Sequence, residues 1–347
     1  MEELNRLLIT GTLALAALSV VNAQPNTWVR SENLNGPARH DALGFAIGDK
    51  VYTCLGLGQE GDTLTDLWEY DDAYSIWMEK AAFPGTPRVG AVTFTIGNMA
   101  YVATGGTVND TLNDLWAYDP VSDAWTQKAD LPGAARTRAV AFTIGQTGYI
   151  TTGVGSPLPE MNGNMQYPEL GDLWAYDQAA DTWTQKATLF NTYYYEWVHT
   201  DVWCGFVLGG KGFAIKLDYS FGEVWAYDPP SDSWSPRTTI DFDLLGWTGG
   251  QRGIGFALGN HGFLLSMGWP QDPLYPTHPN MFLRYSPDTD AWQLMGYFSG
   301  LSRDDVAWAA HEDVAFIMGG AHLYPWPDPD LGIPGENYRM DLSETWS

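Results

Sequence analysis

The chain has 347 residues, among them 17 Trp, 18 Tyr, 14 Phe, 38 Gly and 21 Pro, and its formal net charge is −25. Long helices rarely tolerate this much Gly and Pro, whereas many short strands joined by tight turns need both. The negative charge disfavours nucleic acid and anionic membrane surfaces as partners, because both are themselves negative. The composition therefore predicts an all-β protein that binds neither.

The N-terminal segment is typical of an export signal. An apolar run over 7–21 ends in a cleavage pattern with small residues at Val21 and Ala23. Two glutamates ahead of the run are unusual for a signal peptide, so an uncleaved N-terminal membrane anchor is the alternative. We expect a signal peptide over 1–23 and a mature domain over 24–347, secreted or retained in the periplasm or at the cell surface. No later stretch approaches the roughly 18 apolar residues of a membrane span.

A repeat of about 50 residues fills the mature chain. Residues 113–136 (NDLWAYDPVSDAWTQKADLPGAAR) and 171–189 (GDLWAYDQAADTWTQKATL) nearly copy each other, and weaker copies recur along the sequence. The tryptophan that ends each copy stands at Trp28, Trp77, Trp125, Trp183, Trp234, Trp292 and Trp346. This spacing predicts six structural units rather than several unrelated domains.

The sequence pattern of each unit predicts four strands, which we name a to d in chain order. In the third unit they are VAFTIG, YITTG, DLWAYD and WTQKA, separated by Gly- and Asp-rich turns. A helical alternative fails because glycine pairs and Asp-Pro interrupt the chain about every ten residues. The large aromatic side chains suit the wedge between neighbouring units, where burial of one Trp gives on the order of 4–6 kcal/mol gross.

These features resemble the kelch motif: a glycine doublet after strand b, a Tyr-Asp pair before the tryptophan, and an arginine after it. The doublet is intact at Gly105-Gly106 and Gly319-Gly320 and degraded to Gly56-Leu57-Gly58, Gly153-Val154 and Gly268-Trp269. The match covers about 27–347. The resemblance implies a six-bladed β-propeller of four-stranded antiparallel kelch blades, which need neighbours on both sides.

The two ends of the chain are predicted to close the ring. Seven tryptophan-bearing d frames accompany only six sets of a, b and c strands, and a single residue follows Trp346. We therefore expect Thr27–Ser31 to supply the outer strand of the C-terminal blade. Cys54 then falls on strand b of the first blade and Cys204 on strand a of the fourth, across the axis, which predicts two buried free cysteines rather than a disulfide.

Function is expected at one face of the ring, called the mouth, where the d→a linkers and b→c loops emerge. Three b→c loops are long and irregular: 156–170, 269–280 and 322–337. Variable loops on a rigid scaffold are a common place for binding, although surface loops also vary without function.

Arginines gather in the d→a linkers, which hold six of the ten in the mature chain: Arg39, Arg88, Arg136, Arg138, Arg252 and Arg303. Arginine is suited to two-pronged capture of a carboxylate or phosphate. The alternative is structural for Arg39, Arg88 and Arg136, which recur in register and can each pair with an Asp of the same or the next blade.

Arg138 and Arg252 occupy a second linker position, four residues before the strand-a aromatic. Other repeats carry Asp41, Gly90 and Asp304 there. A position that varies between repeats is the better candidate for ligand contact. In peptide-binding kelch adaptors the corresponding linker residues contact an acidic ligand, and the resemblance implies this role for Arg138 in particular.

The fourth linker, 192–201, has aromatic residues instead of arginine. Tyr193, Tyr194, Tyr195 and Trp197 are candidate stacking platforms for sugar rings, with Glu196 and Asp201 as partners for hydroxyl groups. Packing against a degraded blade explains the same residues equally well.

Two enzyme groups share the kelch propeller. The radical copper oxidases need two His and two Tyr, one of them crosslinked to Cys, and the six His here show no such pairing, although His40 and His199 are placed to reach the mouth. The sugar-acid mutarotases use a mouth arginine and an acidic group, for which Arg138 with Glu196 or Asp304 would serve. We predict no metal and no cofactor.

The sequence thus predicts an exported, monomeric binding or interaction module, with a sugar-acid mutarotase or epimerase as the alternative. The expected partner is a carbohydrate, an acidic small molecule, or a protein or acidic peptide. The candidate ligand-binding residues are Arg39, His40, Arg88, Arg136, Arg138, Tyr194, Glu196, Trp197, His199, Asp201, Arg252, Trp269, Tyr275, Arg303, Asp304 and Trp326.

Overall fold

The computed structural model describes residues 28, 30–159, 165–195, 202–218, 221–242, 252–267, 281–297, 305–311, 314–323, 339–341 and 345–346. The predicted signal peptide lies outside these residues. The described part consists of strands and one 3-10 turn, η1 (Pro229–Ser231). None of its helices is long and apolar enough to cross a membrane. The predicted all-β class is confirmed.

The strands form antiparallel sheets in which chain neighbours pair, as the repeat predicts. The first three sheets are β3 (Leu43–Ile47), β4 (Lys50–Cys54), β6 (Leu67–Asp71) and β7 (Ile76–Lys80); β8 (Val92–Ile96), β9 (Met99–Ala103), β10 (Leu115–Asp119) and β11 (Ala124–Lys128); and β13 (Val140–Ile144), β14 (Thr147–Thr151), β18 (Leu173–Asp177) and β19 (Thr182–Lys186).

The fourth to sixth sheets follow the same order, and the sixth takes its outer strand from the start of the chain. They are β21 (Val202–Leu208), β22 (Lys211–Leu217), β23 (Phe221–Asp228) and β24 (Ser233–Pro236), with β25 (Ile240–Asp241) beside β23; β26 (Arg252–Leu258), β27 (His261–Met267), β28 (Met281–Ser286) and β29 (Ala291–Tyr297); and β30 (Ala307–His311), β31 (Val314–Met318), β34 (Thr345–Trp346) and β1 (Arg30–Ser31).

Additional short strands form at one end of the six sheets, in the linkers and loops that were predicted to form the mouth. They are β2 (Arg39–His40) paired with β5 (Leu57–Gly58); β12 (Arg136–Thr137), β15 (Val154–Gly155), β16 (Leu158–Pro159), β17 (Met165–Glu169) and β20 (Tyr193–Tyr195) in one sheet; and β32 (Ala321–Leu323) paired with β33 (Arg339–Asp341).

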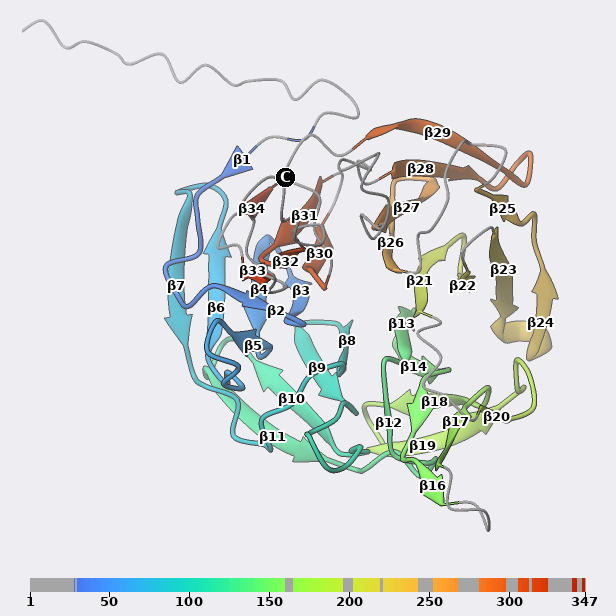
Figure 1. Ribbon diagram of the computed structural model, residues 1–347, viewed down its shortest axis with the longest axis horizontal. Helices are drawn as coiled ribbons and strands as arrows, with labels where there is room; N and C mark the ends of the chain where they lie inside the picture. The colour runs from blue at the N-terminus through green and yellow to red at the C-terminus, as the bar shows by residue number, and fades with distance from the viewer. Residues whose placement is uncertain are drawn as a thin grey trace, which may run out of the picture.

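The sheets stand around a common centre (Figure 1). Their innermost strands contact one another in the cyclic order β3, β8, β13, β21, β26, β30 and back to β3. Small and apolar residues of these strands line a central cavity of about 190 Å³. The pairing expected between the chain ends is present, since Arg30 of β1 lies opposite Trp346 of β34.

Aromatic residues of strands c and d occupy the wedges between sheets. In the second sheet the rings of Tyr118 and Trp125 lie 5.0 Å apart. The indole Nε1 of Trp125 donates to the carbonyl oxygen of Ala81 in the preceding linker at 2.8 Å. Corresponding Tyr–Trp pairs occur in the first, third, fourth and fifth sheets. The repeated tryptophan thus joins one unit to the next, as the sequence predicted.

An aspartate in the turn between strands c and d forms hydrogen bonds across the same boundaries between neighbouring sheets, which we call seams. Asp123 accepts hydrogen bonds from the hydroxyl of Tyr118 at 2.8 Å and from the backbone N–H of Ala81 at 2.9 Å. The third, fourth and fifth sheets repeat this arrangement with Asp181, Asp232 and Asp290. In the first sheet, Ser75 has the same left-handed backbone in the register of these aspartates.

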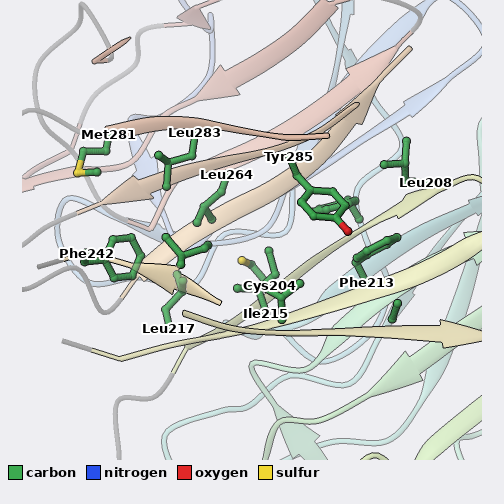
Figure 2. Close-up of a cluster of buried hydrophobic side chains, with 14 residues drawn as sticks. Cys204, Leu208, Phe213, Ile215, Leu217, Phe242, Leu264, Met281, Leu283 and Tyr285 are labelled. Atoms are coloured by element: carbon green, nitrogen blue, oxygen red, sulfur yellow. The ribbon is translucent and has the colours of Figure 1, made fainter. Parts of the chain in front are cut away.

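Both cysteines are buried and free, as predicted. Cys204 belongs to a cluster that joins the fourth and fifth sheets, where Ile215 and Leu217 face Leu264 and Leu283 (Figure 2). Burial raises the pKa of each thiol to about 12, so both stay protonated at neutral pH. The cysteines therefore act as small apolar core residues.

Candidate ligand-binding mouth

Three of the predicted arginines bind the protein's own carboxylates. In the third sheet, Arg136 donates from Nη1 and Nη2 to the two carboxylate oxygens of Asp172, at 2.8 and 2.9 Å. Its Nη1 also donates to the carbonyl oxygen of Thr152 at 3.1 Å, and its Nε to that of Ala134 at 3.0 Å. The indole of Trp174 donates to Asp172 as well, at 2.6 Å. We call this arrangement the arginine staple.

The first and second sheets contain the same staple. Arg39 pairs with Asp66 and Arg88 pairs with Asp114, each in two-pronged geometry. All three arginines are at most 1 % exposed. Burial opposes ionisation of the three aspartates, but the hydrogen bonds and charge of the arginines outweigh it and lower the pKa of each carboxyl. Arg39, Arg88 and Arg136 thus form structural ion pairs with aspartates of the protein, the alternative to ligand binding, and their guanidinium groups are buried.

The staple also holds a left-handed backbone turn after strand b. The carbonyl that Arg88 binds belongs to Thr104, whose φ is 61°, and Gly105 follows with φ 99°. A Cβ at Gly105 would lie 2.9 Å from the side chain of Ala91. The turn therefore uses Thr104-Gly105 and begins one residue before the Gly105-Gly106 doublet of the sequence.

Leu55-Gly56 and Thr152-Gly153 form the same turn in the first and third units. In these two units the turn likewise begins one residue before the glycine that starts the degraded doublet. The Gly319-Gly320 doublet stands in the predicted register, with both residues in left-handed backbone.

Arg138 differs from the staple arginines in its surroundings. It is exposed, and its guanidinium makes no hydrogen bond or ion pair within the described part of the chain. Its backbone is left-handed, with φ 56°, and its N–H donates to the carbonyl oxygen of Gly90 at 2.7 Å. A Cβ at Gly90 would lie 3.3 Å from Cγ of Arg138. The absence of a side chain at position 90 therefore makes room for the arginine stem.

The sixth unit is offset by one residue from the predicted register. Asp305, with φ 51°, precedes β30 in the way that Asp41, also with φ 51°, precedes β3. The backbone N–H of Asp41 donates to the carbonyl oxygen of Asp305 at 2.8 Å. The counterpart of Arg138 in this unit is thus Asp305, and the prediction of Asp304 is corrected by one position. Counting back two residues places Arg303 in the register of the staple arginines.

The fourth sheet builds a comparable network from other positions. Glu169, which is buried at the end of β17, accepts a hydrogen bond from the indole of Trp203 at 2.8 Å. It also pairs with the ammonium group of Lys216 at 3.1 Å. This cation, carboxylate and indole replace those of the staple. Sequence reasoning missed Glu169, because it lies in the irregular loop 156–170, which does not repeat the sequence of the other units.

Aromatic residues of the fourth linker form a stack beside this network. Phe190 stacks on Trp203 with ring centroids 5.5 Å apart, and Tyr193 stacks on Phe190 at 5.7 Å. Tyr193 and Tyr194 are nevertheless 55 % and 54 % exposed, on the short strand β20. The linker therefore serves packing at Phe190 while it presents two tyrosines to solvent.

The remaining candidates are only partly described. His40 is buried, with Nδ1 3.2 Å from Oδ2 of Asp41. Arg252 begins β26, and its backbone alone is described. The candidates outside the described residues are Glu196, Trp197, His199, Asp201, Trp269, Tyr275, Arg303, Asp304 and Trp326.

Comparisons with known proteins agree with this architecture. The family model for the Kelch motif matches residues 87–132. The solved structure of YjhT has 16 % sequence identity and a TM-score of 0.63, and the match covers 90 % of this chain and 95 % of that one. No curated protein matches. Because 477 chains of solved structures match, the likeness identifies a widely used fold rather than one function. The chain therefore contains a Kelch motif and has a β-propeller fold.

Proposed function

We propose that this propeller is an exported binding module that takes an anionic ligand at its mouth, either an acidic carbohydrate or an acidic peptide. The contrast between Arg138 and the staple arginines carries the proposal. Kelch propellers are in general interaction modules, so a binding role needs no chemistry beyond the scaffold. An exposed guanidinium at the mouth adds a preference for carboxylate or phosphate groups.

Arg138 has features of a ligand-contact residue rather than a packing residue. The staple two residues earlier fixes the backbone of its linker, so the arginine projects from a rigid base. Its left-handed φ is unfavourable for a residue other than glycine, and glycine occupies the matching position in the second unit. The fold therefore has no need of an arginine here, and such strain often accompanies function.

The exposed tyrosines of β20 support the carbohydrate version of the proposal. A flat ring that is more than half exposed offers apolar area for the face of a sugar, and its hydroxyl offers a hydrogen bond. Tyr193 is held in place by Phe190, which lowers the entropy lost on binding. An acidic sugar would use both features, with its carboxylate at Arg138 and a ring face on tyrosine.

The mutarotase alternative requires an acid or base within roughly 3 Å of the bound anomeric centre. The two acids predicted for that role, Glu196 and Asp304, lie outside the described residues. Since no described contact favours catalysis, binding is the function we propose.

The decisive experiment compares the unmodified protein with Arg138→Gly, which copies Gly90. Thermal shift and calorimetry would use glucuronate, N-acetylneuraminate, hexaglutamate and neutral maltose. We expect an acidic ligand to raise the melting temperature of the unmodified protein and to lose roughly tenfold or more in affinity for the variant, because a charge-assisted contact contributes ~1.5–3 kcal/mol. Arg138→Lys, which keeps the charge, should retain part of the binding. Equal binding by Arg138→Gly, or no binding of any probe, would overturn the proposal.

A further inference from the structure

A group of potential metal ligands lies where the first and sixth sheets meet. His40, Asp41 and Asp305 each offer one donor atom, and these atoms all lie within 4.8 Å of one another. The imidazole is 5 % exposed, and both aspartates are half-buried. An imidazole and two carboxylates therefore converge from two linkers that are distant in sequence.

The backbone around this group is held firmly. His40 belongs to β2, where it lies opposite Leu57 of β5. The staple of Arg39 ties the same strand to Asp66. The hydrogen bond from the N–H of Asp41 to the carbonyl oxygen of Asp305 joins the two linkers at 2.8 Å. The three side chains thus start from fixed positions, which reduces the ordering that ion binding would require.

The kelch-like repeat does not require His40 and Asp41 at their positions. At the positions of His40 and Asp41 the second unit has Val89-Gly90 and the third has Thr137-Arg138. The strands and staples of those units form without an imidazole or an aspartate in this place. The polar group is therefore an addition at one boundary of the ring, where an imidazole and two half-buried carboxylates converge.

We propose that His40, Asp41 and Asp305 bind a divalent transition-metal ion, and that Zn²⁺ is the best match. Zinc takes His nitrogen and Asp oxygen at about 2.0–2.2 Å, which sets tetrahedral donors roughly 3.4 Å apart. The three donor atoms lie within 4.8 Å of one another, so binding requires the carboxylates to move closer to the imidazole. Imidazole disfavours Ca²⁺ and Mg²⁺, which prefer oxygen ligands alone. Three protein ligands leave one coordination position for water or another small ligand.

The test measures binding of Zn²⁺ alone to chelator-treated protein by calorimetry. Two variants copy the second unit, His40→Val and Asp41→Gly, and His261→Gln controls for adventitious binding to another histidine. We expect one ion per chain and affinity weakened by at least roughly tenfold in both variants but unchanged in the control. Ca²⁺ should bind at least roughly tenfold more weakly than Zn²⁺. Absence of stoichiometric binding, or variants that bind Zn²⁺ as tightly as the unmodified protein, would overturn the proposal.

Cobalt spectroscopy supplies a second readout that does not depend on stability. Co²⁺ in place of Zn²⁺ should give d–d absorption bands that disappear in His40→Val, whereas retention of the bands would contradict imidazole ligation. If His40→Val does not fold, Asp305→Asn is titrated instead, with the same expectation. The site is independent of the proposed anionic ligand, because Arg138→Gly should bind Zn²⁺ as tightly as the unmodified protein. Failure of either proposal is therefore distinguishable from failure of the other.

Discussion

The first three sheets and the fourth and fifth sheets build the edge of the mouth in different ways. In the first three, strands a and b have five residues each and stop at left-handed turns. In the fourth and fifth, the same strands have seven residues, and the ladder continues through positions such as Trp203 and Lys216. The shorter strands occur in the units that carry an arginine staple.

The difference shows that the staple and the strand break belong together. A carbonyl can reach Arg136 only if the backbone at Thr152 turns away from the ladder, and the arginine in turn satisfies that carbonyl. Without the arginine, pairing along a regular ladder satisfies the same backbone groups. The repeat therefore satisfies the backbone groups at the end of strand b in two ways, and only one of them requires a buried arginine.

The largest expected effect comes from breaking a staple. Arg136→Ala leaves the carboxylate of Asp172 without its cation and Thr152 without a donor, so we expect a loss of about 3–5 kcal/mol in the free energy of unfolding. Urea denaturation measures it. The matched control is Arg138→Ala, two residues away and exposed, which should change stability by less than about 0.5 kcal/mol. Similar losses in the two variants would contradict the assignment of one arginine to structure and the other to the surface.

The network of the fourth sheet should be weaker than a staple. Glu169→Gln keeps an acceptor for the indole of Trp203 but removes the charge that Lys216 faces. Because Lys216 is partly exposed and can turn to water, we expect a loss of about 1–3 kcal/mol. The measurement is the same denaturation curve, with Glu79→Gln, an exposed carboxylate on β7, as a control. A loss of unfolding free energy as large as that of Arg136→Ala would show that the network of the fourth sheet stabilises the fold as much as an arginine staple does.

Acid should weaken the stapled sheets. The pKa values of Asp114 and Asp172 are lowered in the folded protein, so each carboxylate stabilises the fold above its unfolded pKa of about 3.9. That stability is lost as the pH falls below about 4 and through the folded pKa. Denaturation midpoints between pH 7 and 2.5 should fall more steeply in the unmodified protein than in Asp172→Asn. Parallel curves would mean that the staple does not govern acid stability.

The smallest effect concerns the strained backbone at the mouth. Arg138→Gly removes the cost of a left-handed φ, so we expect it to raise stability by up to about 1 kcal/mol. The melting temperature compared with that of Arg138→Ala, which retains the unfavourable φ, isolates this contribution. A glycine variant less stable than the alanine variant would indicate that the arginine side chain supports the fold.

Much of the fold could be predicted because the same pattern of strand and turn residues recurs several times along the sequence. Regular tryptophans, turn residues and alternating apolar positions define the four-stranded unit, and the extra d frame indicates the pairing of the chain ends. The register at the mouth was harder to predict. The expected register was counted from the strand-a aromatic, but Trp308 is the second residue of β30 whereas Phe45 is the third of β3, so Asp305 stands where Asp304 was expected.

The roles of the arginines could be predicted only in part. Arg88 and its partner Asp114 are 26 residues apart, so nothing local distinguishes this arginine from one that binds a ligand. One signal was present: an Asp-Leu-Trp sequence begins strand c in each of the three units whose staple is described. The mouth group of His40, Asp41 and Asp305 gave no such signal, because its members come from opposite ends of the chain.

The replacement of aspartate by Ser75 gives the ring a preferred place to open. Each of the four boundaries from the first to the fifth sheet has an aspartate that ties a turn to the preceding linker. Among the described residues, the boundary at Ser75 has no such aspartate, and its bonds include those from Trp77 to the carbonyl oxygen of Glu32 at 3.2 Å and from Asp41 to Asp305 at 2.8 Å. The adjoining strands β1 and β34 have two residues each. Heat or mechanical load should therefore separate the sheets at this junction before the four boundaries that an aspartate ties.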